Sequence, residues 1–494
     1  MVPHPGSQLL VRSRRQLLCD DVLILRGSRP SDDSSLSRDW PTNIQWGLGS
    51  VEKSPKPVFV GSHPWEEGTF NWFRVLYDGG RFRCWYNADA IDTICGHTRQ
   101  YDKVAYAESE DGIHWRTPEL GLIEWNGSRN NNLVFDAARP DGWLADGPAP
   151  FVDPTARPEE RYKMVYVDST GSPHTRLMLR GAYSPDGLHW QRYPEVFSPK
   201  FHDTQNVATY DPLLGKYVAY VRGAAYYGGI ALPPDPIPRA RRGRAIWRME
   251  SEDFHDWSSP ESCIEPDIAD PLDMDFYTNA YSFYPWADRV HFMFPAAFHA
   301  GAQKTNIQVA VSRDNQHWIR PTREVLINNG VKGSYDEGMI YVTPGIVDIG
   351  NDRLALYTQV ASLGKDSLVR QRSPYHGFAM SRVTFLRDRI IGIEAGVEEG
   401  LFSTRDLIFE GGRLDMNVEP TRPNGQLRVE LVSAETNKVC PGYEFAACDP
   451  ITADRVNAVA TWNGKAELGE WAKKPVRLRF KLLSIRIYAI QFLG

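Results

Sequence analysis

The sequence lacks long apolar runs and is poor in cysteine. None of its hydrophobic stretches approaches the ~20 residues that span a bilayer. Its 6 cysteines in 494 residues form no CxxC pair and no Cys/His spacing typical of a metal site. The sequence therefore predicts no membrane association, no metal site and reduced, mostly buried thiols. We expect no cofactor; a structural Ca²⁺ stays open as an alternative that no ligand motif supports.

A strong positive charge is also missing. The 56 Lys and Arg against 62 Asp and Glu give a net charge of −6, which argues against nucleic acid or an anionic membrane as a partner. No apolar segment follows the basic residues of 1–15, so the sequence predicts no secretory signal and favours the cytoplasm. The motifs GxSxG, Walker A and HExxH are absent, which disfavours the enzyme classes built on them. The oligomeric state stays open.

What the sequence does contain is a motif that occurs four times. It reads Ser-x-Asp and places a Trp four residues after the Asp, in copies that begin at Ser109, Ser184, Ser251 and Ser312. The copies are about 60 to 75 residues apart, and each follows a strand-like run. We expect the Ser and Asp side chains to bond the local backbone in a turn, and the Trp to fill the gap between neighbouring sheets.

Two strand-like runs joined by a short turn precede each copy, and a fifth such pair lies before Ser381. The pairs are 70–77 with 81–87, 149–152 with 162–167, 206–210 with 216–221, 281–284 with 289–294, and 338–347 with 353–359. Five units of roughly four strands predict an all-β chain, with a five-bladed β-propeller as its catalytic domain over residues 56–395. Residues 385–400 are interpreted as a linker, and alternating runs over 401–494 predict a β-sandwich. Residues 1–55 are expected to pack on the propeller.

Acidic residues recur just before the first strand of each unit. They are Glu66, Glu67, Asp146, Asp203, Asp275, Asp336 and Glu337. Innermost propeller strands converge on one axis, so these positions predict a carboxylate-lined axial pocket. Taken singly, each acid could equally be a turn former or a strand cap. As a set they suit glycoside chemistry, in which one carboxylic acid protonates the leaving oxygen and another acts as nucleophile or base.

Other side chains near the same strand ends are candidates for substrate binding. The aromatic candidates for stacking on sugars are Trp65, Trp72, Trp143, Tyr277, Tyr281 and Tyr335, and the polar candidates are His202, Asn206, Arg222, Asn279 and Asp336. The alternative for each is ordinary packing or a structural hydrogen bond. The basic stretch 239–244 is interpreted as a solvated loop, with a lid over the pocket as the alternative.

The sequence resembles the five-bladed propeller glycosidases, the superfamily of invertase, levansucrase, arabinanase and β-xylosidase. The resemblance is carried by the four motifs and by His202-Asp203, Tyr210-Asp211 and Lys216-Tyr217-Val218. The resemblance covers about residues 56–395, and the remaining tail resembles the β-sandwich of invertase-like enzymes. It implies that Asp203 stabilises the transition state.

Two invertase motifs are absent from this sequence. Trp65-Glu66-Glu67 stands near the place of the Trp-x-Asn-Asp-Pro start. The Glu-Cys acid motif is missing, which leaves Asp275 or Glu337 as proton donor. These departures indicate a furanosidase-like branch that acts on another furanoside or on a pyranoside.

The sequence therefore predicts a glycoside hydrolase or transglycosylase acting on an oligosaccharide or polysaccharide. Glu337 is the preferred general acid, Asp203 the transition-state stabiliser, and Asp146 or the Glu66/Glu67 pair the nucleophile or base. Two alternatives remain: a phosphorylase on the same fold, which needs a basic cluster in the pocket, and a non-catalytic sugar-binding propeller. Retention or inversion depends on the distance between the two carboxyl groups, which the sequence does not give.

Overall fold

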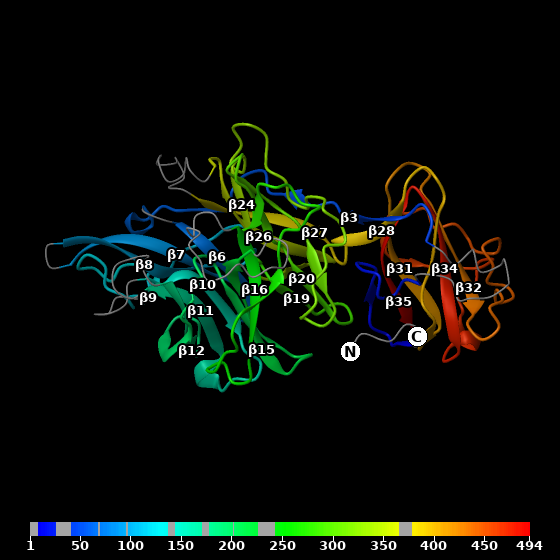
Figure 1. The fold of residues 1–494 in the computed structure, drawn as a ribbon, viewed down its shortest axis with the longest axis horizontal. Helices are drawn as coiled ribbons and strands as arrows, with labels where there is room; N and C mark the ends of the chain where they lie inside the picture. Colours follow the sequence, from blue (N-terminus) through cyan, green and yellow to red (C-terminus); the bar gives the residue numbers. More distant parts are fainter. Residues whose placement is uncertain are drawn as a thin grey trace.

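The computed structural model is built almost entirely of β-strands, which confirms the predicted all-β class (Figure 1). It describes residues 8–25, 41–67, 70–94, 97–136, 144–169, 177–200, 202–225, 243–364 and 378–494. The described helical elements are the short 3₁₀ turns η2 (Pro64–Glu66), η3 (Pro158–Glu160) and η6 (Gly469–Trp471). Within these ranges no helix is long and apolar enough to cross a membrane.

Five sheets follow one another along most of the chain. The first three are β6 (Phe70–Asp78), β7 (Arg81–Ile94), β8 (His97–Ser109) and β9 (Leu133–Asp136); β10 (Asp146–Val152), β11 (Tyr162–Ser169), β12 (Leu177–Ser184) and β13 (Gln191–Ser198); and β14 (Val207–Asp211), β15 (Lys216–Ala224), β16 (Arg244–Ser251) and β17 (Glu261–Ile264). All strands within each of these sheets are antiparallel.

The fourth sheet is divided, and the fifth takes strands from near the start of the chain. The two halves of the fourth are β18 (Met274–Phe276), β21 (Ala296–His299) and β22 (Lys304–Ile307), and β19 (Ser282–Tyr284), β20 (Val290–Met293) and β23 (Ala310–Ser312). The fifth holds β24 (Met339–Val342), β25 (Val347–Gly350), β26 (Arg353–Ala361) and β27 (Ala379–Leu386) with β4 (Glu52–Lys53) and β5 (Phe59–Val60). The predicted strand pairs therefore appear at the predicted places, apart from this division.

These five sheets contact one another in cyclic order. The first strand of each of the first two sheets contacts the first strand of the next, β6 with β10 and β10 with β14. The third sheet contacts the fourth through β16 and β18, and the fourth contacts the fifth through β22 and β24. Strand β26 of the fifth sheet contacts β6, so the first sheet neighbours both the second and the fifth.

Each repeated motif forms the turn expected from its Ser and Asp. In the second copy, Ser184 Oγ accepts the amide N–H groups of Asp186 at 3.3 Å and Gly187 at 2.9 Å. Asp186 Oδ1 accepts those of Leu188 at 2.8 Å and His189 at 2.9 Å. The same pattern of bonds to the Asp recurs at Asp111, Asp253 and Asp314.

In three copies, the carbonyl of the residue after the motif Asp accepts a hydrogen bond from an aromatic side chain of a neighbouring sheet. Tyr357 donates to the carbonyl of Gly112 at 3.0 Å, Trp85 to that of Gly187 at 2.7 Å, and Tyr220 to that of Asn315 at 3.1 Å. The position has a left-handed backbone, with φ +79° at Gly187. A Cβ there would lie 2.7 Å from Trp85, so this copy requires glycine.

The motif Trp residues pack between sheets, as predicted. Trp190 packs against a core cluster that contains Trp85 of the first sheet and Tyr162 of the second. Trp318 packs against a cluster with residues of the third and fourth sheets, and its ring lies 5.6 Å from that of Tyr220. These tryptophans are therefore part of the core rather than sugar-binding residues.

The motif aspartates make stability depend on pH in acid. Partial burial alone would raise the pKa of Asp186, but the amide and imidazole of His189 lower it from 3.8 to about 2. A carboxyl with a lowered pKa stabilises the fold above its unfolded value, and this contribution is lost as the pH falls toward the folded value. We expect the urea midpoint to fall as the pH is lowered from 3.8 to about 2.

An Asp186→Asn variant is the control for this effect. Its amide oxygen still accepts the two backbone N–H groups but does not titrate, so the midpoint should change less with pH than in the wild type. Equal pH dependence in the two proteins would show that Asp186 contributes nothing.

Two further sheets pack face to face around a separate core (Figure 1). One contains β1 (Leu9–Val11), β29 (Gly400–Ser403), β30 (Leu407–Phe409), β32 (Gln426–Ser433) and β34 (Pro475–Leu483), and the other β2 (Gln16–Leu17), β3 (Gln45–Leu48), β28 (Ile391–Ala395), β31 (Arg413–Pro420), β33 (Arg455–Val459) and β35 (Ile485–Leu493). The rings of Phe409 and Phe492 stack between the sheets at 4.1 Å.

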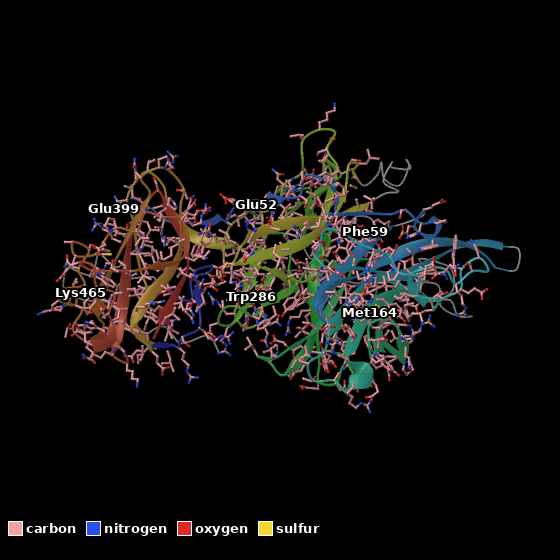
Figure 2. The ribbon with its side chains drawn as sticks, turned by 180° about the vertical axis from the view of Figure 1, so that it is seen from behind. Glu52, Phe59, Met164, Trp286, Glu399 and Lys465 are labelled. Atoms are coloured by element: carbon pink, nitrogen blue, oxygen red, sulfur yellow. The ribbon has the colours of Figure 1, made fainter. Side chains whose placement is uncertain are left out.

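The boundaries of these parts differ from the prediction. Strands β1, β2 and β3 complete the two C-terminal sheets instead of packing on the first five, while β4 and β5 join the fifth sheet beside β27. Figure 2 shows Glu52 and Phe59 on the larger part, apart from Glu399 and Lys465 on the smaller. The segment interpreted as a linker contains β28. Strands of two to four residues carry too little alternation to reveal their partners.

The described cysteines are unpaired. Cys19, Cys84, Cys440 and Cys448 are buried, and Cys263 is partly buried. Burial raises the pKa of the Cys19 thiol to about 12, so this group is an unreactive thiol at neutral pH.

Candidate functional site

Side chains from neighbouring sheets converge on the ring of Tyr277, which directly follows β18. The guanidinium group of Arg244 lies over this ring at 4.5 Å, and that of Arg222 at 5.6 Å. The ring of Tyr341, from β24 of the fifth sheet, lies 5.3 Å away. We call Asp203, Arg222, Arg244, Asp275, Tyr277 and Tyr341 the Tyr277 cluster.

The hairpin of β15 and β16 places the two arginines together. Its register pairs Arg222 with Ile246 and Ala224 with Arg244. Residues two apart on a strand share a face, so the two arginines are diagonal neighbours on one side of the sheet.

Each arginine pairs with a carboxylate of the cluster. Arg222 Nη1 lies 3.0 Å from Asp203 Oδ2, and Arg244 Nη1 lies 2.8 Å from Asp275 Oδ2. The two carboxylates differ in access, because the Asp203 side chain is 44% exposed and that of Asp275 only 12%. Among the described residues, the buried Oδ1 of Asp275 has no hydrogen-bond partner, so this oxygen can accept a proton or a substrate hydroxyl.

Two arginines and two acids influence the pKa of Tyr277. Burial raises the pKa of Tyr277, while Arg244 and Arg222 lower it and Asp203 and Asp146 raise it. Asp146 is the first residue of β10 in the second sheet, so four of the five sheets contribute charge or an aromatic ring to this region.

The first sheet adds Trp72. Its ring lies 5.6 Å from that of Tyr341. The backbone at Trp72 has φ +50°, and its N–H group donates to Gln359 Oε1 at 2.5 Å. The register of β6 against β7 shifts between Asn71 and Arg74, and such a bulge re-aims the side chains that follow it.

The structure thus brings together six of the predicted site residues: Trp72, Asp146, Asp203, Arg222, Asp275 and Tyr277. Trp143 lies outside the described residues. Tyr281 is buried, with its hydroxyl 2.9 Å from His291 Nδ1. The other predicted residues lie in different surroundings, described next.

Glu66 and Trp65 belong to a buried network around η2. Glu66 accepts hydrogen bonds from the amides of Ser62 at 2.7 Å and His63 at 2.8 Å, and from the hydroxyl of Tyr86 at 2.6 Å. Trp65 donates to Asn132 at 2.9 Å and is buried. The neighbouring Glu67 is exposed. Both oxygens of Glu66 are therefore engaged in holding this turn.

His202, Asn206 and Asn279 are buried and support the backbone. His202 lies 2.7 Å from Ser198 Oγ and 2.8 Å from the carbonyl of Arg222, and burial lowers its pKa to about 4. Asn206 accepts the amide of Arg222 at 3.0 Å. His202 and Asn206 therefore position Arg222, while Asn279 bonds the backbone of the neighbouring strands.

Tyr335 and Asp336 hold the segment that contains β4. The Tyr335 hydroxyl donates to the carbonyl of Ser54 at 2.5 Å, and Lys53 pairs with Asp336 at 2.5 Å. Asp336 is 3% exposed. Both residues thus attach the segment before β24 to the segment that contains β4.

Glu337, the preferred general acid, has surroundings that keep it ionised. Its carboxylate accepts the amide of Gly333 at 2.7 Å and lies 3.4 Å from Lys304 Nζ. The Gly333 amide lowers the pKa of Glu337, and Lys304 adds to this. A proton donor needs a raised pKa, so the lowered pKa of Glu337 does not favour its role as general acid.

The sequence reasoning missed Arg244 and Tyr341. Arg244 was grouped with the basic stretch 239–244 and interpreted as solvated, although it begins β16 and is mostly buried. Residues 239–242 lie outside the described ranges. Arg244 is placed beside Arg222 by the register of β16 against β15. The sequence does not give this register.

The described residues contain no group of three or more His, Cys, Asp or Glu side chains arranged to hold a metal ion. The Tyr277 cluster itself offers two carboxylate–guanidinium pairs beside aromatic rings.

Comparison with protein-family models and with curated proteins finds no match. Similar solved structures include an N-acetylgalactosamine deacetylase from F. plautii in complex with blood group B trisaccharide (12% identical, TM-score 0.46, covering 70% of this chain and 96% of that one). The β-1,2-mannobiose phosphorylase from Listeria innocua is 9% identical, with TM-score 0.46 and coverage of 68% and 96%. A glycosyl hydrolase from Bacteroides ovatus is 15% identical, with TM-score 0.43 and coverage of 68% and 94%.

Proposed function

We propose that this chain is a carbohydrate-active enzyme that cleaves or transfers a glycosyl unit of an oligosaccharide or polysaccharide at the Tyr277 cluster. The observation that carries the proposal is the placement of two carboxylates from adjacent sheets, Asp203 and Asp275, beside one tyrosine ring. Glycosidases use a pair of carboxyl groups on either side of the scissile bond, and aromatic rings beside them pack against sugar faces.

We further propose that the first five sheets form a closed five-bladed propeller. Their cyclic order of contacts supports this, since β26 of the fifth sheet lies against β6 of the first. The pairing of β4 and β5 with β27 supports it as well, because it joins the start of the array to its end. In such a ring the starts of the inner strands meet at one end of the axis, where Asp146, Asp203 and Asp275 lie.

The roles follow from the surroundings of each acid. Asp275 is the proton donor: its Oδ1 has no hydrogen-bond partner among the described residues, so a proton there displaces no hydrogen bond between them, while Arg244 holds Oδ2. Asp203, paired with Arg222 and more exposed, supplies negative charge to the oxocarbenium-like transition state. Asp146 is the remaining acid near the ring and acts as nucleophile or base.

The two arginines favour phosphorolysis as a second candidate. A phosphorylase needs cationic groups that bind phosphate in place of the attacking water, and guanidinium groups bind phosphate through two parallel hydrogen bonds. Arg222 and Arg244 both face Tyr277.

A panel of p-nitrophenyl glycosides and natural oligosaccharides, assayed with and without inorganic phosphate, tests both candidates. We expect turnover of at least one substrate by the wild type, and much slower turnover of it by Asp203→Asn. Turnover that requires phosphate and yields a sugar phosphate would identify the phosphorylase. A wild type that binds a sugar but turns over no substrate would leave the non-catalytic propeller instead.

A further inference from the structure

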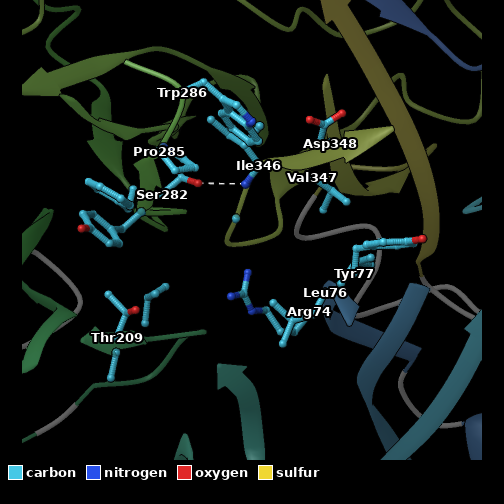
Figure 3. Close-up of a pocket in the computed structure, with 16 residues that line it drawn as sticks. Arg74, Leu76, Tyr77, Thr209, Ser282, Pro285, Trp286, Ile346, Val347 and Asp348 are labelled. Carbon is cyan, nitrogen blue, oxygen red and sulfur yellow. Dashed lines mark hydrogen bonds between the residues drawn. The ribbon is translucent and has the colours of Figure 1, made fainter. Parts of the chain in front are cut away.

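A separate cavity of about 380 Å³ lies among the same sheets (Figure 3). Its lining comes from four of them: 74–77 of the first, 207–209 of the third, 281–283 with 285–286 of the fourth, and 345–348 of the fifth. No residue of the Tyr277 cluster lines it. Strand β6 reaches both places, since Trp72 contacts Tyr341 and Arg74 faces the cavity.

The amide of Gln205 ties the first and second sheets together. Its Nε2 donates to the carbonyls of Trp72, Phe73 and Pro148, each at 3.1 Å. Gln205 is buried. It thereby holds the backbone of β6 between Trp72, which contacts Tyr341, and Arg74, which lines the cavity.

Most of the cavity wall is apolar. Figure 3 shows Pro285, Trp286 and Ile346 on one side and Thr209 across from them. The Ser282 hydroxyl already accepts the amide of Ile346 at 2.8 Å. Pockets for small organic ligands typically have this composition, with a few polar groups that fix orientation.

Two charged side chains, Arg74 and Asp348, line the cavity, and among the described residues only Asp348 has a partner of opposite charge. Asp348 lies 3.0 Å from Arg387. Arg74 is 8% exposed, and its guanidinium donates from Nε to the carbonyl of Pro150 at 2.8 Å and from Nη1 to that of Pro344. Within the described part of the chain, its Nη2 has no hydrogen-bond partner and no carboxylate pairs with it. Burial lowers the pKa of Arg74 to about 10.

The backbone around Arg74 is shaped to hold the guanidinium in this place. The bulge in β6 precedes it directly. Gly345 has φ +93°, and a Cβ there would lie 2.3 Å from Arg74 Nη1, so only glycine leaves room for the group. A buried cation without a counter-ion is costly and gains most from an anion that enters with it.

We propose that this cavity is a second binding site, which takes a small molecule with a carboxylate on an apolar body. The carboxylate accepts hydrogen bonds from Arg74 Nη2, and the body packs against Trp286, Ile346 and Val347. The proposal is independent of the glycosidase proposal, because it uses none of the Tyr277 cluster.

Calorimetric titration of the full chain with phenylacetate, phenylacetamide and acetate tests it. Phenylacetate should bind about tenfold or more tightly than either of the others, because a hydrogen bond to a charged group and apolar burial each contribute that much. Arg74→Met should lower phenylacetate affinity about tenfold or more, and so should Thr209→Phe, which fills the cavity and leaves Arg74 in place. Asp275→Asn should bind phenylacetate as the wild type does.

The outcomes separate this site from the glycosidase site. The proposal would be overturned if phenylacetamide bound as tightly as phenylacetate. It would also be overturned if phenylacetate did not bind at millimolar concentration. Unchanged affinity in Thr209→Phe would overturn it as well, and this variant decides the matter even if Arg74→Met fails to fold. Tighter phenylacetate binding by Asp275→Asn, which removes the anion paired with Arg244, would place the ligand at the Tyr277 cluster instead.

Discussion

Asp275→Asn is expected to lower kcat/KM about 10²- to 10⁴-fold on glycosides with poor leaving groups, the range for loss of a general acid. The amide fills the same space beside Arg244 but has no proton to give to the leaving oxygen. Aryl glycosides whose phenol is strongly acidic need little protonation, so their loss should be much smaller. Steady-state rates on a series of aryl glycosides measure this difference. Asp203→Asn should lower the rates of the whole series alike, because it removes charge from the transition state.

The matched control is Asp273→Asn, an exposed aspartate two residues away, which should keep wild-type rates. Glu337→Gln distinguishes the site proposed here from the one that the sequence favoured, and we expect it to keep most of the activity. If Glu337→Gln lowered kcat/KM by a factor that depends on the leaving group, and Asp275→Asn did not lower kcat/KM, Glu337 would be the proton donor.

Arg313→Met is expected to cost about 3–5 kcal/mol in the free energy of unfolding, the range for breaking a buried ion pair by removing one partner. Arg313 Nε lies 2.6 Å from Asp20 Oδ2, and Nη2 donates to the carbonyl of Leu17 at 2.7 Å. Burial lowers the pKa of Arg313, but Asp20 outweighs it and holds the pKa above its usual value. The methionine would leave Asp20 buried and uncompensated. Urea unfolding followed by tryptophan fluorescence gives the free energy.

Two variants check that the buried charge is the cause. Arg353→Met removes a partly exposed pair with Glu52 and should cost at most about 1 kcal/mol. Adding Asp20→Asn to Arg313→Met should restore part of the lost stability, since no buried charge then remains. A cost for Arg313→Met no larger than that for Arg353→Met would contradict the prediction.

The sequence was sufficient to predict the strands of the first five sheets because each unit carries its own signals. A turn separates two β runs, and a Ser-x-Asp motif follows. The role of the motif between sheets was predicted only in part. The motif Trp was predicted to fill the gap between sheets, but the hydrogen bond from Trp85 to the carbonyl of Gly187 was not predicted. This bond joins residues of two different repeats, so the sequence of either repeat alone does not indicate it.

For the candidate site, the sequence could predict which acids lie near the first strand of each sheet but not which way their side chains face. Asp203 precedes β14 and Asp275 lies within β18, and each pairs with an arginine that lies over the ring of Tyr277. Glu66 precedes β6, yet local amides at Ser62 and His63 hold its carboxylate in a turn. Glu337 is held in the same manner by Gly333. The choice between a free and a capping carboxylate depends on local backbone direction, which composition and spacing do not encode.

The short strands β4 and β5 have a consequence for how the chain is made. They precede the first sheet in sequence but pair with β27, which follows the fourth. During synthesis the second, third and fourth sheets can form as they emerge, because their strands are local. The segment with β4 and β5 must wait, unpaired, until the ribosome has added β27, and β1 and β2 wait longer still for β30 and β35. Assembly of the fifth sheet and of the C-terminal core is therefore the late, non-local step of folding, and it is slowed by the cost of closing loops of that length.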